Sequence, residues 1–175
     1  MLKVKKVNKK LNEYNKIIDI YKRSFPQNEK LPIFILDMMS KRKGVDFLAF
    51  YDDDIFCGFT YLVSNKNMTF VFYLAVDDSM RSNGYGSKII RWIINNKEDN
   101  IVLNIEEVDE KYNNYEQRLS RQKFYLKNGF IDTKYDIKDK NNIYDVLYRG
   151  NNFIKEEYEA LIKRFSFGFI SIILK

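Results

Sequence analysis

The segment Met68–Val76, MTFVFYLAV, constrains the fold most, because it is apolar on both faces. A strand with one solvated face alternates apolar and polar residues, so this strand is predicted to lie inside a sheet. The turn RSNGYGSKII and a helical stripe of isoleucines follow it, and a second apolar segment, Ile101–Glu107, comes next. A strand, a helix and a strand in succession predict a right-handed crossover and a parallel strand pair.

The rest of the chain supplies shorter periodic segments. Further strands are expected over residues 2–7, 45–51, 55–64, 130–138 and 143–148. Helices are expected over residues 14–25, from Pro32 to before Gly44, over 113–128 and over 154–165. Most neighbouring strands are joined by short polar turns, which favour antiparallel pairing. The sequence therefore predicts an α/β (α+β) single domain with a central, mixed, mostly antiparallel twisted sheet flanked by helices.

The 175 residues include no histidine. This excludes Ser-His-Asp and Cys-His nucleophile systems and a histidine ligand for a metal, so we expect no metal. Proton transfer must then use Asp, Glu, Tyr, Lys, backbone or water. The lone Cys57 excludes a disulfide framework, no apolar run approaches about eighteen residues, and MLKVKKVNKK lacks the apolar core of a secretory signal. We expect a cytoplasmic protein with no membrane association.

The net charge is +6, but it is distributed unevenly. Residues 51–110, which hold the glycine-containing turn, carry 5 basic and 11 acidic groups. A nucleic-acid-binding protein concentrates Lys and Arg along its recognition element. No specific nucleic-acid partner is therefore expected.

The turn itself has the pattern Arg81-x-x-Gly84-x-Gly86 between a strand and a helix. Backbone N–H groups at the positive end of a helix dipole bind phosphate oxygens. The two glycines let the backbone approach a ligand and permit positive φ, and Arg81 adds charge-assisted hydrogen bonds. The third glycine of a dinucleotide site and the first glycine of a P-loop are missing. The alternative is a glycine turn without a ligand.

A second motif is FYLKNGF, Phe124–Phe130. Gly129 and Phe130 can end a helix, with Phe130 packing on Phe124, without any chemistry. Tyr125, however, adds a hydroxyl that packing does not require. Together, the two motifs resemble those of the GNAT acetyltransferase superfamily, whose patterns are Q/R-x-x-G-x-G/A and F-Y-x-x-x-G-F. The resemblance covers about residues 1–148, and the helix and apolar tail of residues 149–175 either complete the core or make a contact in a homodimer.

The resemblance implies a GNAT fold with a V-shaped splay between the fourth and fifth strands, in which acetyl-CoA lies. The pantetheine arm is expected along the backbone of Leu74, Ala75 and Val76, and an N–H near Leu74 would hold the oxyanion. The pyrophosphate is expected to be held by Arg81, Ser82, Asn83, Gly84, Tyr85, Gly86 and Ser87. Arg121 would contact coenzyme A, lower the pKa of the motif tyrosine, or face solvent.

The implied reaction is direct acetyl transfer to an amine in a ternary complex. Tyr125 matches the family residue that protonates the departing thiolate. Some GNAT enzymes carry a glutamate where this chain has Thr69 and Phe70, so Glu106 is the candidate base, with a solvated strand end as its alternative. Glu29 is a candidate substrate contact or a surface residue.

Two functions remain open from the sequence. One is an acetyl-CoA-dependent N-acetyltransferase that acts on a small-molecule or peptide amine. Its acceptor is expected to be cationic, because four acidic residues cluster after the strand at 101–107: Glu106, Glu107, Asp109 and Glu110. The other is a catalytically silent GNAT-like module that binds acetyl-CoA as a sensor or interaction domain.

Overall fold

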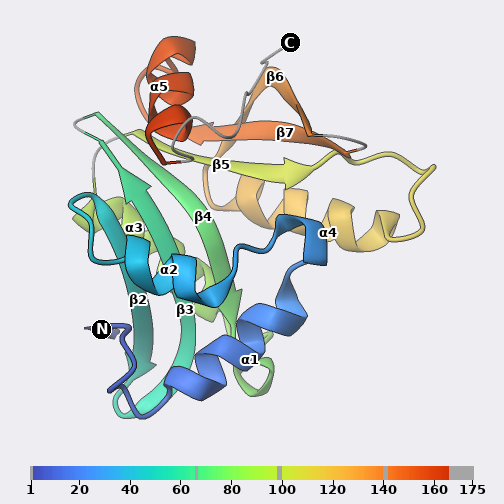
Figure 1. Cartoon of the computed structure of the whole chain (residues 1–175). Coiled ribbons are helices and arrows are strands. Elements are labelled where there is room, and N and C mark those ends of the chain that lie inside the picture. Colours follow the sequence, from blue (N-terminus) through green and yellow to red (C-terminus); the bar gives the residue numbers. More distant parts are fainter. Residues whose placement is uncertain (1, 66, 98–99, 140–141, 166–175) are drawn as a thin grey trace. The chain divides into compact units, whose positions relative to one another are not determined.

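The computed structural model describes residues 2–65, 67–97, 100–139 and 142–165 (Figure 1). In this part of the chain, the strands are β1 (Lys3–Lys6), β2 (Val45–Asp52), β3 (Ile55–Ser64), β4 (Met68–Val76), β5 (Asn100–Glu106), β6 (Ile131–Asp139) and β7 (Asn142–Arg149). The α-helices are α1 (Tyr14–Ser24), α2 (Ile33–Met39), α3 (Tyr85–Asn96), α4 (Tyr115–Lys127) and α5 (Lys155–Phe165). Short 3₁₀ helices cover Gln27–Glu29 (η1) and Asp78–Met80 (η2).

The strands form a mixed sheet with the order β1-β2-β3-β4-β5-β7-β6. The predicted parallel pair is confirmed, because Met68, Thr69 and Phe70 of β4 pair with Asn100, Ile101 and Val102 of β5. The pairs β1–β2, β2–β3, β5–β7 and β6–β7 are antiparallel, as a mostly antiparallel sheet requires. These register pairs do not test the predicted splay, which stays a prediction for the rest of β4.

The chain divides into two compact units. The first unit comprises Met1–Val63 and Phe72–Asn95, and the second comprises Ser64–Val71 and Asn96–Lys175. The strand β4 therefore begins in the second unit and continues into the first.

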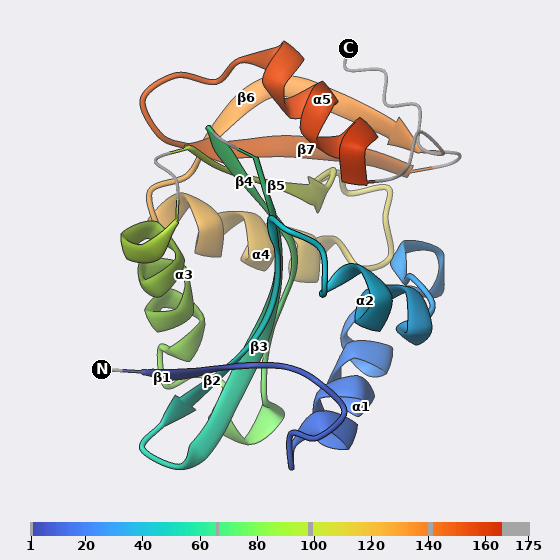
Figure 2. The same cartoon turned by 60° about the vertical axis from the view of Figure 1, so that its left-hand side comes forward.

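In the first unit, helices cover both faces of the strands. Figure 2 shows α3 on one side of β2 and β3, and α1 and α2 on the other. The helix α1 buries Ile17, Ile20 and Tyr21 and ends at Ser24, because Phe25 takes the extended backbone favoured before a proline. The isoleucine stripe of α3 is buried as predicted, with Ile89 and Ile93 fully inaccessible.

In the second unit, α4 lies below β5 in Figure 1 and α5 lies above β7. The helix α5 buries Tyr158, Leu161, Ile162 and Phe165. The Tyr158 hydroxyl donates to Asn104 Oδ1 at 3.0 Å. Burial of this apolar stripe fixes α5 in the unit's core, whereas the predicted tail contact of residues 166–175 lies outside the described residues.

The two ends of α4 differ in how their backbone groups are satisfied. Gly129 has a φ of +84° and follows the helix, so its predicted role as the left-handed terminating residue is confirmed. Asn114 precedes the helix, but no side chain caps it. The Asn114 Oδ1 instead accepts a hydrogen bond from Arg118 Nε at 2.8 Å, because a charged donor competes for the same oxygen.

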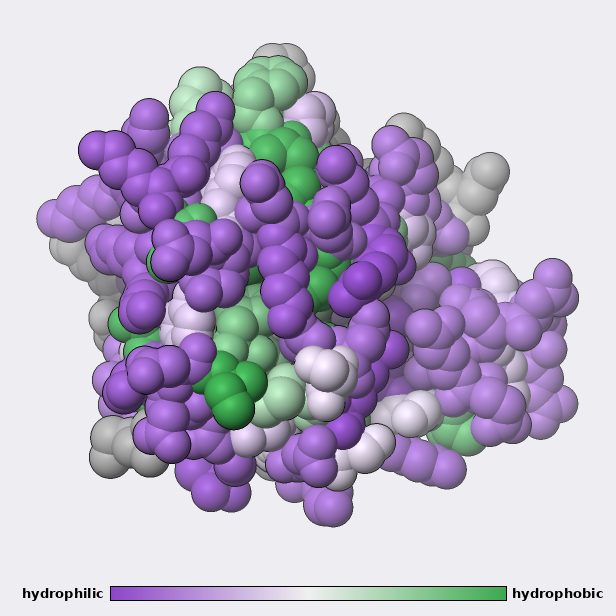
Figure 3. All heavy atoms as spheres, turned by 90° about the horizontal axis from the view of Figure 1, so that it is seen from below, coloured by the Kyte–Doolittle hydropathy of each residue, from purple (hydrophilic) through white to green (hydrophobic). Residues whose placement is uncertain are grey.

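Hydrophilic side chains dominate the face of the molecule shown in Figure 3, as expected for a chain in which 31% of residues are charged. Smaller apolar areas lie between them. Among the described residues, no helix is long and apolar enough to cross a bilayer.

Candidate active site

The glycine loop, residues 81–87, runs from the end of η2 into the first turn of α3 in the first unit. Ser82 and Gly84 have φ values of +64° and +75°, so the chain makes a left-handed turn just before the helix begins at Tyr85. Gly86 lies inside the helix and does not adopt the positive φ that a glycine permits. Gly86 can therefore help the loop through its small size, which lets a ligand approach the backbone closely, and not through a positive φ.

The beginning of α3 presents unpaired backbone donors. The first N–H to bond within the helix is that of Lys88, which donates to the Gly84 carbonyl at 3.0 Å. The N–H groups of Tyr85, Gly86 and Ser87 precede it and have no acceptor in the helix. A Cβ built on Gly84 would meet no atom within 4 Å, so the space beside the turn is open. This arrangement suits an anionic group.

A buried aspartate, which the sequence analysis missed, anchors the start of the loop. Asp77 is 3% exposed, and its Oδ1 accepts hydrogen bonds from the N–H (3.0 Å) and hydroxyl (2.7 Å) of Ser79. Its Oδ2 lies 2.5 Å from Lys16 Nζ of α1. Burial alone would raise the pKa of Asp77, but the hydrogen bonds from Lys16 and Ser79 outweigh it and lower the pKa. The carboxylate therefore fixes α1 to the end of β4.

Asp78 links the glycine loop to a second arginine. The carboxylate of Asp78 lies 2.7 Å from Arg81 Nη2 and 2.6 Å from Arg23 Nη2 of α1. All three side chains are about half exposed. Two guanidinium groups, only one of them in the motif, are thus held beside the glycine loop.

The side chain of Tyr85 points to a different partner. Its hydroxyl donates to Asp52 Oδ2 at 2.7 Å, and Lys88 Nζ lies 3.5 Å from the same oxygen. This hydrogen bond raises the pKa of Tyr85 to about 12. The Tyr85 side chain therefore connects the loop to the end of β2. The backbone N–H of Tyr85 is the group that can bind a ligand.

The strand segment Leu74–Val76 has a close neighbour in β3. A Cβ on Gly58 would lie 2.4 Å from the Ala75 carbonyl oxygen and 3.0 Å from Val76 Cα. Only glycine permits this approach, which coincides with the irregular register between β2 and β3 after Phe50. The sequence alone does not show that Gly58 contacts this part of β4.

Two buried tyrosines hold the loop that contains Glu29. The Tyr73 hydroxyl donates to the Glu29 carbonyl oxygen at 2.6 Å, and the Tyr21 hydroxyl donates to the Leu31 carbonyl oxygen at 2.9 Å. The two hydroxyls lie 3.3 Å apart. The loop between α1 and α2 is thus tied to β4 of the same unit, which fixes the backbone of Glu29.

In the second unit, Glu106 binds two arginines of α4. Its Oε1 lies 3.0 Å from Arg118 Nη2 and its Oε2 lies 2.9 Å from Arg121 Nη1. Glu106 is 8% exposed and Arg118 is 7% exposed. Arg118 also donates to the Glu107 carbonyl at 2.9 Å. Glu106 is therefore a buried, doubly paired carboxylate and not a solvated strand end.

Tyr125 lies one helical turn after Arg121. Its ring packs on Phe130 with centroids 5.6 Å apart, so the tyrosine itself, and not Phe124 as predicted, makes this contact. Burial raises the pKa of Tyr125 to about 12, against the opposing charge of Arg121. Among the described residues, its hydroxyl has no hydrogen-bond partner. The phenol is therefore neutral at physiological pH and can donate a proton.

Acidic side chains gather on β6 and β7 of the same unit. Asp145 pairs with Asp136 across the two strands. Burial raises the pKa of Asp145 to about 6, and the charges of Asp132, Asp136 and Glu107 add to this effect. No group of three or more potential metal ligands is found in the described part of the chain.

Comparison with known proteins decides the family. The family model "Acetyltransferase (GNAT) domain" matches residues 43–132, which is just over half of the chain. The chain belongs to the GNAT acetyltransferase family. The GNAT match includes the glycine loop, Glu106 and Tyr125, and the chain is accordingly an acyltransferase.

Solved structures share the GNAT fold. A Bacteroides thetaiotaomicron protein assigned to the GNAT family superposes with a TM-score of 0.79 at 19% identity, covering 96% of this chain and 99% of that one. An aminoglycoside 6′-N-acetyltransferase solved with coenzyme A gives 0.61 at 13%, covering 84% and 96%. The ribosomal-protein-S18-alanine N-acetyltransferase of Escherichia coli gives 0.58 at 12%, covering 89% and 97%. No curated protein matches the sequence.

Proposed function

We propose that this chain transfers the acetyl group of acetyl-CoA to a primary amine. The observation that supports this most is the left-handed turn at Ser82 and Gly84, which leaves three N–H groups without an acceptor in the helix. A diphosphate fits this set of donors, because α3 adds the positive end of its dipole and Arg81 adds a guanidinium. A GNAT neighbour was solved with coenzyme A, which supports the same ligand here.

The remaining coenzyme contacts follow the strand before the loop. The backbone of Leu74, Ala75 and Val76 would pair with the amides of pantetheine, and the Leu74 N–H would stabilise the oxyanion formed during transfer. Acetyl-CoA itself would supply the acetyl group as an activated thioester. Gly58 keeps this part of β4 in place by allowing β3 to approach it.

Tyr125 is proposed as the general acid that protonates the departing thiolate. Its phenol is buried and has no hydrogen-bond partner in the described part of the chain, which suits this step, and Arg121 would stabilise the tyrosinate that forms. Glu106 would act as a base only if it released an arginine, since both of its oxygens are paired. We therefore assign Glu106 a positioning role toward Arg121 and propose that the acceptor ammonium loses its proton through water to bulk solvent before it attacks the thioester.

The acceptor is proposed to be a cationic amine. Asp132, Asp136 and Asp145 lie together on β6 and β7 and would favour a positive charge. GNAT neighbours include enzymes named for an aminoglycoside and for a ribosomal protein, so both small molecules and polypeptides belong in the test. Glu29 would contact the acceptor from the fixed α1–α2 loop.

A binding module without catalysis is the second candidate function. The observation that favours it is Thr69, which stands where some GNAT enzymes have a glutamate and is fully buried against the Ser64 hydroxyl at 2.9 Å. Such a position cannot supply a base. A module of this kind would bind acetyl-CoA and leave it intact.

Release of free coenzyme A thiol from acetyl-CoA separates the two functions. The panel should hold an aminoglycoside, spermidine, a peptide with a free N-terminus and a peptide lysine. Thiol release that depends on one of these amines supports the transferase. Binding of acetyl-CoA without amine-dependent release supports the module.

A further inference from the structure

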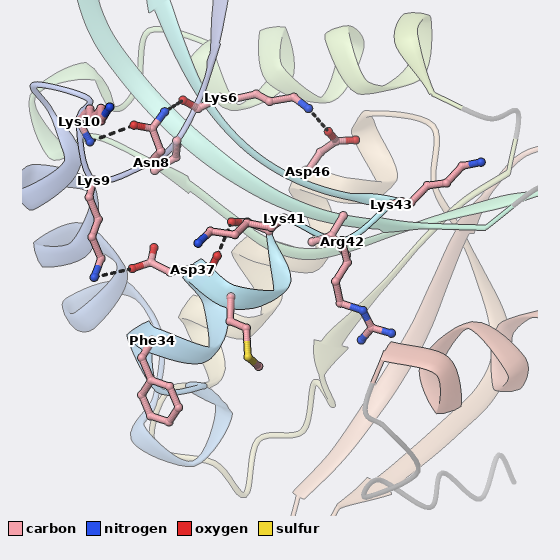
Figure 4. Close-up of a pocket in the computed structure, with 15 residues that line it drawn as sticks. Lys6, Asn8, Lys9, Lys10, Phe34, Asp37, Lys41, Arg42, Lys43 and Asp46 are labelled. Atoms are coloured by element: carbon pink, nitrogen blue, oxygen red, sulfur yellow. Dashed lines mark hydrogen bonds and ion pairs between the residues drawn. The ribbon is translucent and has the colours of Figure 1, made fainter.

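A basic pocket lies in the first unit, apart from the glycine loop and from Leu74–Val76. Its volume is about 1140 Å³. Three segments line it, namely residues 6–10 from the end of β1 onward, the outer face of α2 and residues 40–46 up to the start of β2 (Figure 4). No proposed contact of acetyl-CoA or of the acceptor lies among these residues. The lining of the pocket is therefore distinct from the proposed active-site residues.

The charges that line the pocket do not balance. Six are basic, from Lys6, Lys9, Lys10, Lys41, Arg42 and Lys43. Two are acidic, from Asp37 and Asp46, which leaves an excess of four positive charges.

Both acidic groups are already engaged. Asp37 accepts a hydrogen bond from the Tyr14 hydroxyl at 2.6 Å and lies 3.8 Å from Lys9 Nζ. Asp46 Oδ1 lies 4.0 Å from Lys6 Nζ. Within the described residues, the side chains of Lys10, Lys41 and Lys43 have no carboxylate partner. An acidic ligand would supply the missing counter-charges.

The pocket also exposes two large apolar side chains. Phe34 is 67% exposed and Met38 is 51% exposed. They lie one turn apart on α2 and both line the pocket. Exposed apolar groups of this size mark interaction surfaces, and methionine adapts its shape to varied partners. The ligand should therefore carry an apolar group beside its negative charges.

We infer that the basic pocket docks an acidic segment of a partner protein. Carboxylates of that segment pair with Lys10, Lys41 and Lys43, and one of its apolar side chains packs on Phe34 and Met38. A polypeptide supplies both kinds of group at neighbouring positions. A nucleic acid fits less well, because the basic groups line a pocket instead of following an extended track.

The test is a fluorescence-anisotropy titration of the full chain at low salt. The probe is a labelled twelve-residue peptide that alternates glutamate with leucine and phenylalanine. We expect micromolar binding that weakens by about tenfold between 50 and 500 mM salt. A peptide with lysine in place of each glutamate should not bind. No binding of the acidic probe, or equal binding of a twelve-nucleotide DNA, would overturn the proposal.

Matched variants locate the binding. Lys41→Glu with Lys43→Glu should weaken it by about tenfold, and Phe34→Gln with Met38→Gln by about fivefold without a change in charge. Lys123→Glu with Lys127→Glu, an exposed pair on α4, changes the net charge equally and should leave the affinity within about twofold. Equal loss in the α4 variant would mean non-specific attraction and overturn the site.

A second measurement does not depend on any variant. Amide NMR shifts of the unaltered protein should change on peptide addition at residues 6–10, 34–38 and 40–46. Shifts confined to other residues would contradict the proposal. Because acetyl-CoA is not part of this test, its outcome is independent of the proposed catalytic function.

Discussion

The carboxylate of Asp78 lies 2.7 Å from the guanidinium of Arg81 and so occupies the one charged group that the glycine motif contributes. The same carboxylate lies 2.6 Å from Arg23, a residue 58 positions earlier than Arg81 in the chain. A diphosphate entering the loop would compete with Asp78 for both arginines. Coenzyme affinity should therefore depend on all three residues.

We expect Arg23→Gln and Arg81→Gln each to raise the Kd for coenzyme A by about fivefold, since each removes a half-exposed charge contact of about 1 kcal/mol. Asp78→Asn should lower the Kd at low salt, because it removes the competing carboxylate. Isothermal titration calorimetry measures these changes. Arg91→Gln, exposed on α3, is the matched control. S-acetylpantetheine lacks the diphosphate, so an equal effect of Arg23→Gln on its binding would contradict the assignment.

Replacing Tyr125 by phenylalanine should lower kcat by about two orders of magnitude while KM for acetyl-CoA changes little, because the phenol acts on the leaving group. With its pKa raised to about 12, Tyr125 stays protonated, and wild-type turnover should not fall between pH 8 and 10. Stopped-time thiol assays across this range measure both effects. If turnover instead fell at alkaline pH with an apparent pKa near 9, and Tyr125→Phe no longer showed this fall, the phenol would lose its proton at too low a pH to be the proposed general acid.

The contact between Gly58 and β4 predicts a stability defect. In Gly58→Ala, the new Cβ would meet backbone atoms of Ala75 and Val76, which cannot rotate away. We expect a loss of about 1–3 kcal/mol in the free energy of unfolding, together with weaker acetyl-CoA binding. Chemical denaturation provides the first value. Gly86→Ala lies in the first turn of α3, where alanine is a better helix former, and should cost no stability.

Asp145 predicts a pH dependence of stability. Its pKa rises from 3.8 to about 6 on folding, so the folded state binds more protons than the unfolded state between these values. Stability should therefore fall as the pH increases from about 4 to 6. Asp145→Asn should remove this slope and gain about 1 kcal/mol at pH 7, after allowance for solvent screening, with no gain at pH 3. Urea titrations give the free energy of unfolding of Asp145→Asn and of the exposed control Asp54→Asn at each pH. The same pH dependence in both variants would contradict this prediction.

The parts of the fold that the sequence predicts well are local. A strand, the turn at Gly84 and a helix follow one another within thirty residues, and their apolar spacing reports their type directly. Gly129 at the end of α4 is predicted for the same reason. The family motifs add the expected ligand, because they combine this local geometry with residue types of known chemistry.

The parts that the sequence does not predict depend on distant pairs. Arg118 is buried against Glu106, which lies twelve residues earlier in the chain and on another element. Lys16 meets Asp77, and Tyr21 meets Tyr73, only after the chain has folded. Single charged or aromatic residues carry no periodic signal, so their partners become visible only in three dimensions.

Calorimetric titration of the wild-type chain with acetyl-CoA, followed by the same titration of a variant that lacks the left-handed turn, tests whether the glycine loop binds the coenzyme. Gly84→Val should abolish binding while the protein remains folded, because a β-branched residue resists the φ of +75° that the loop requires. We expect one site per chain for the wild type, with micromolar affinity. Absence of any heat of binding to the folded wild-type protein, or unchanged affinity in folded Gly84→Val, would contradict coenzyme binding at the glycine loop.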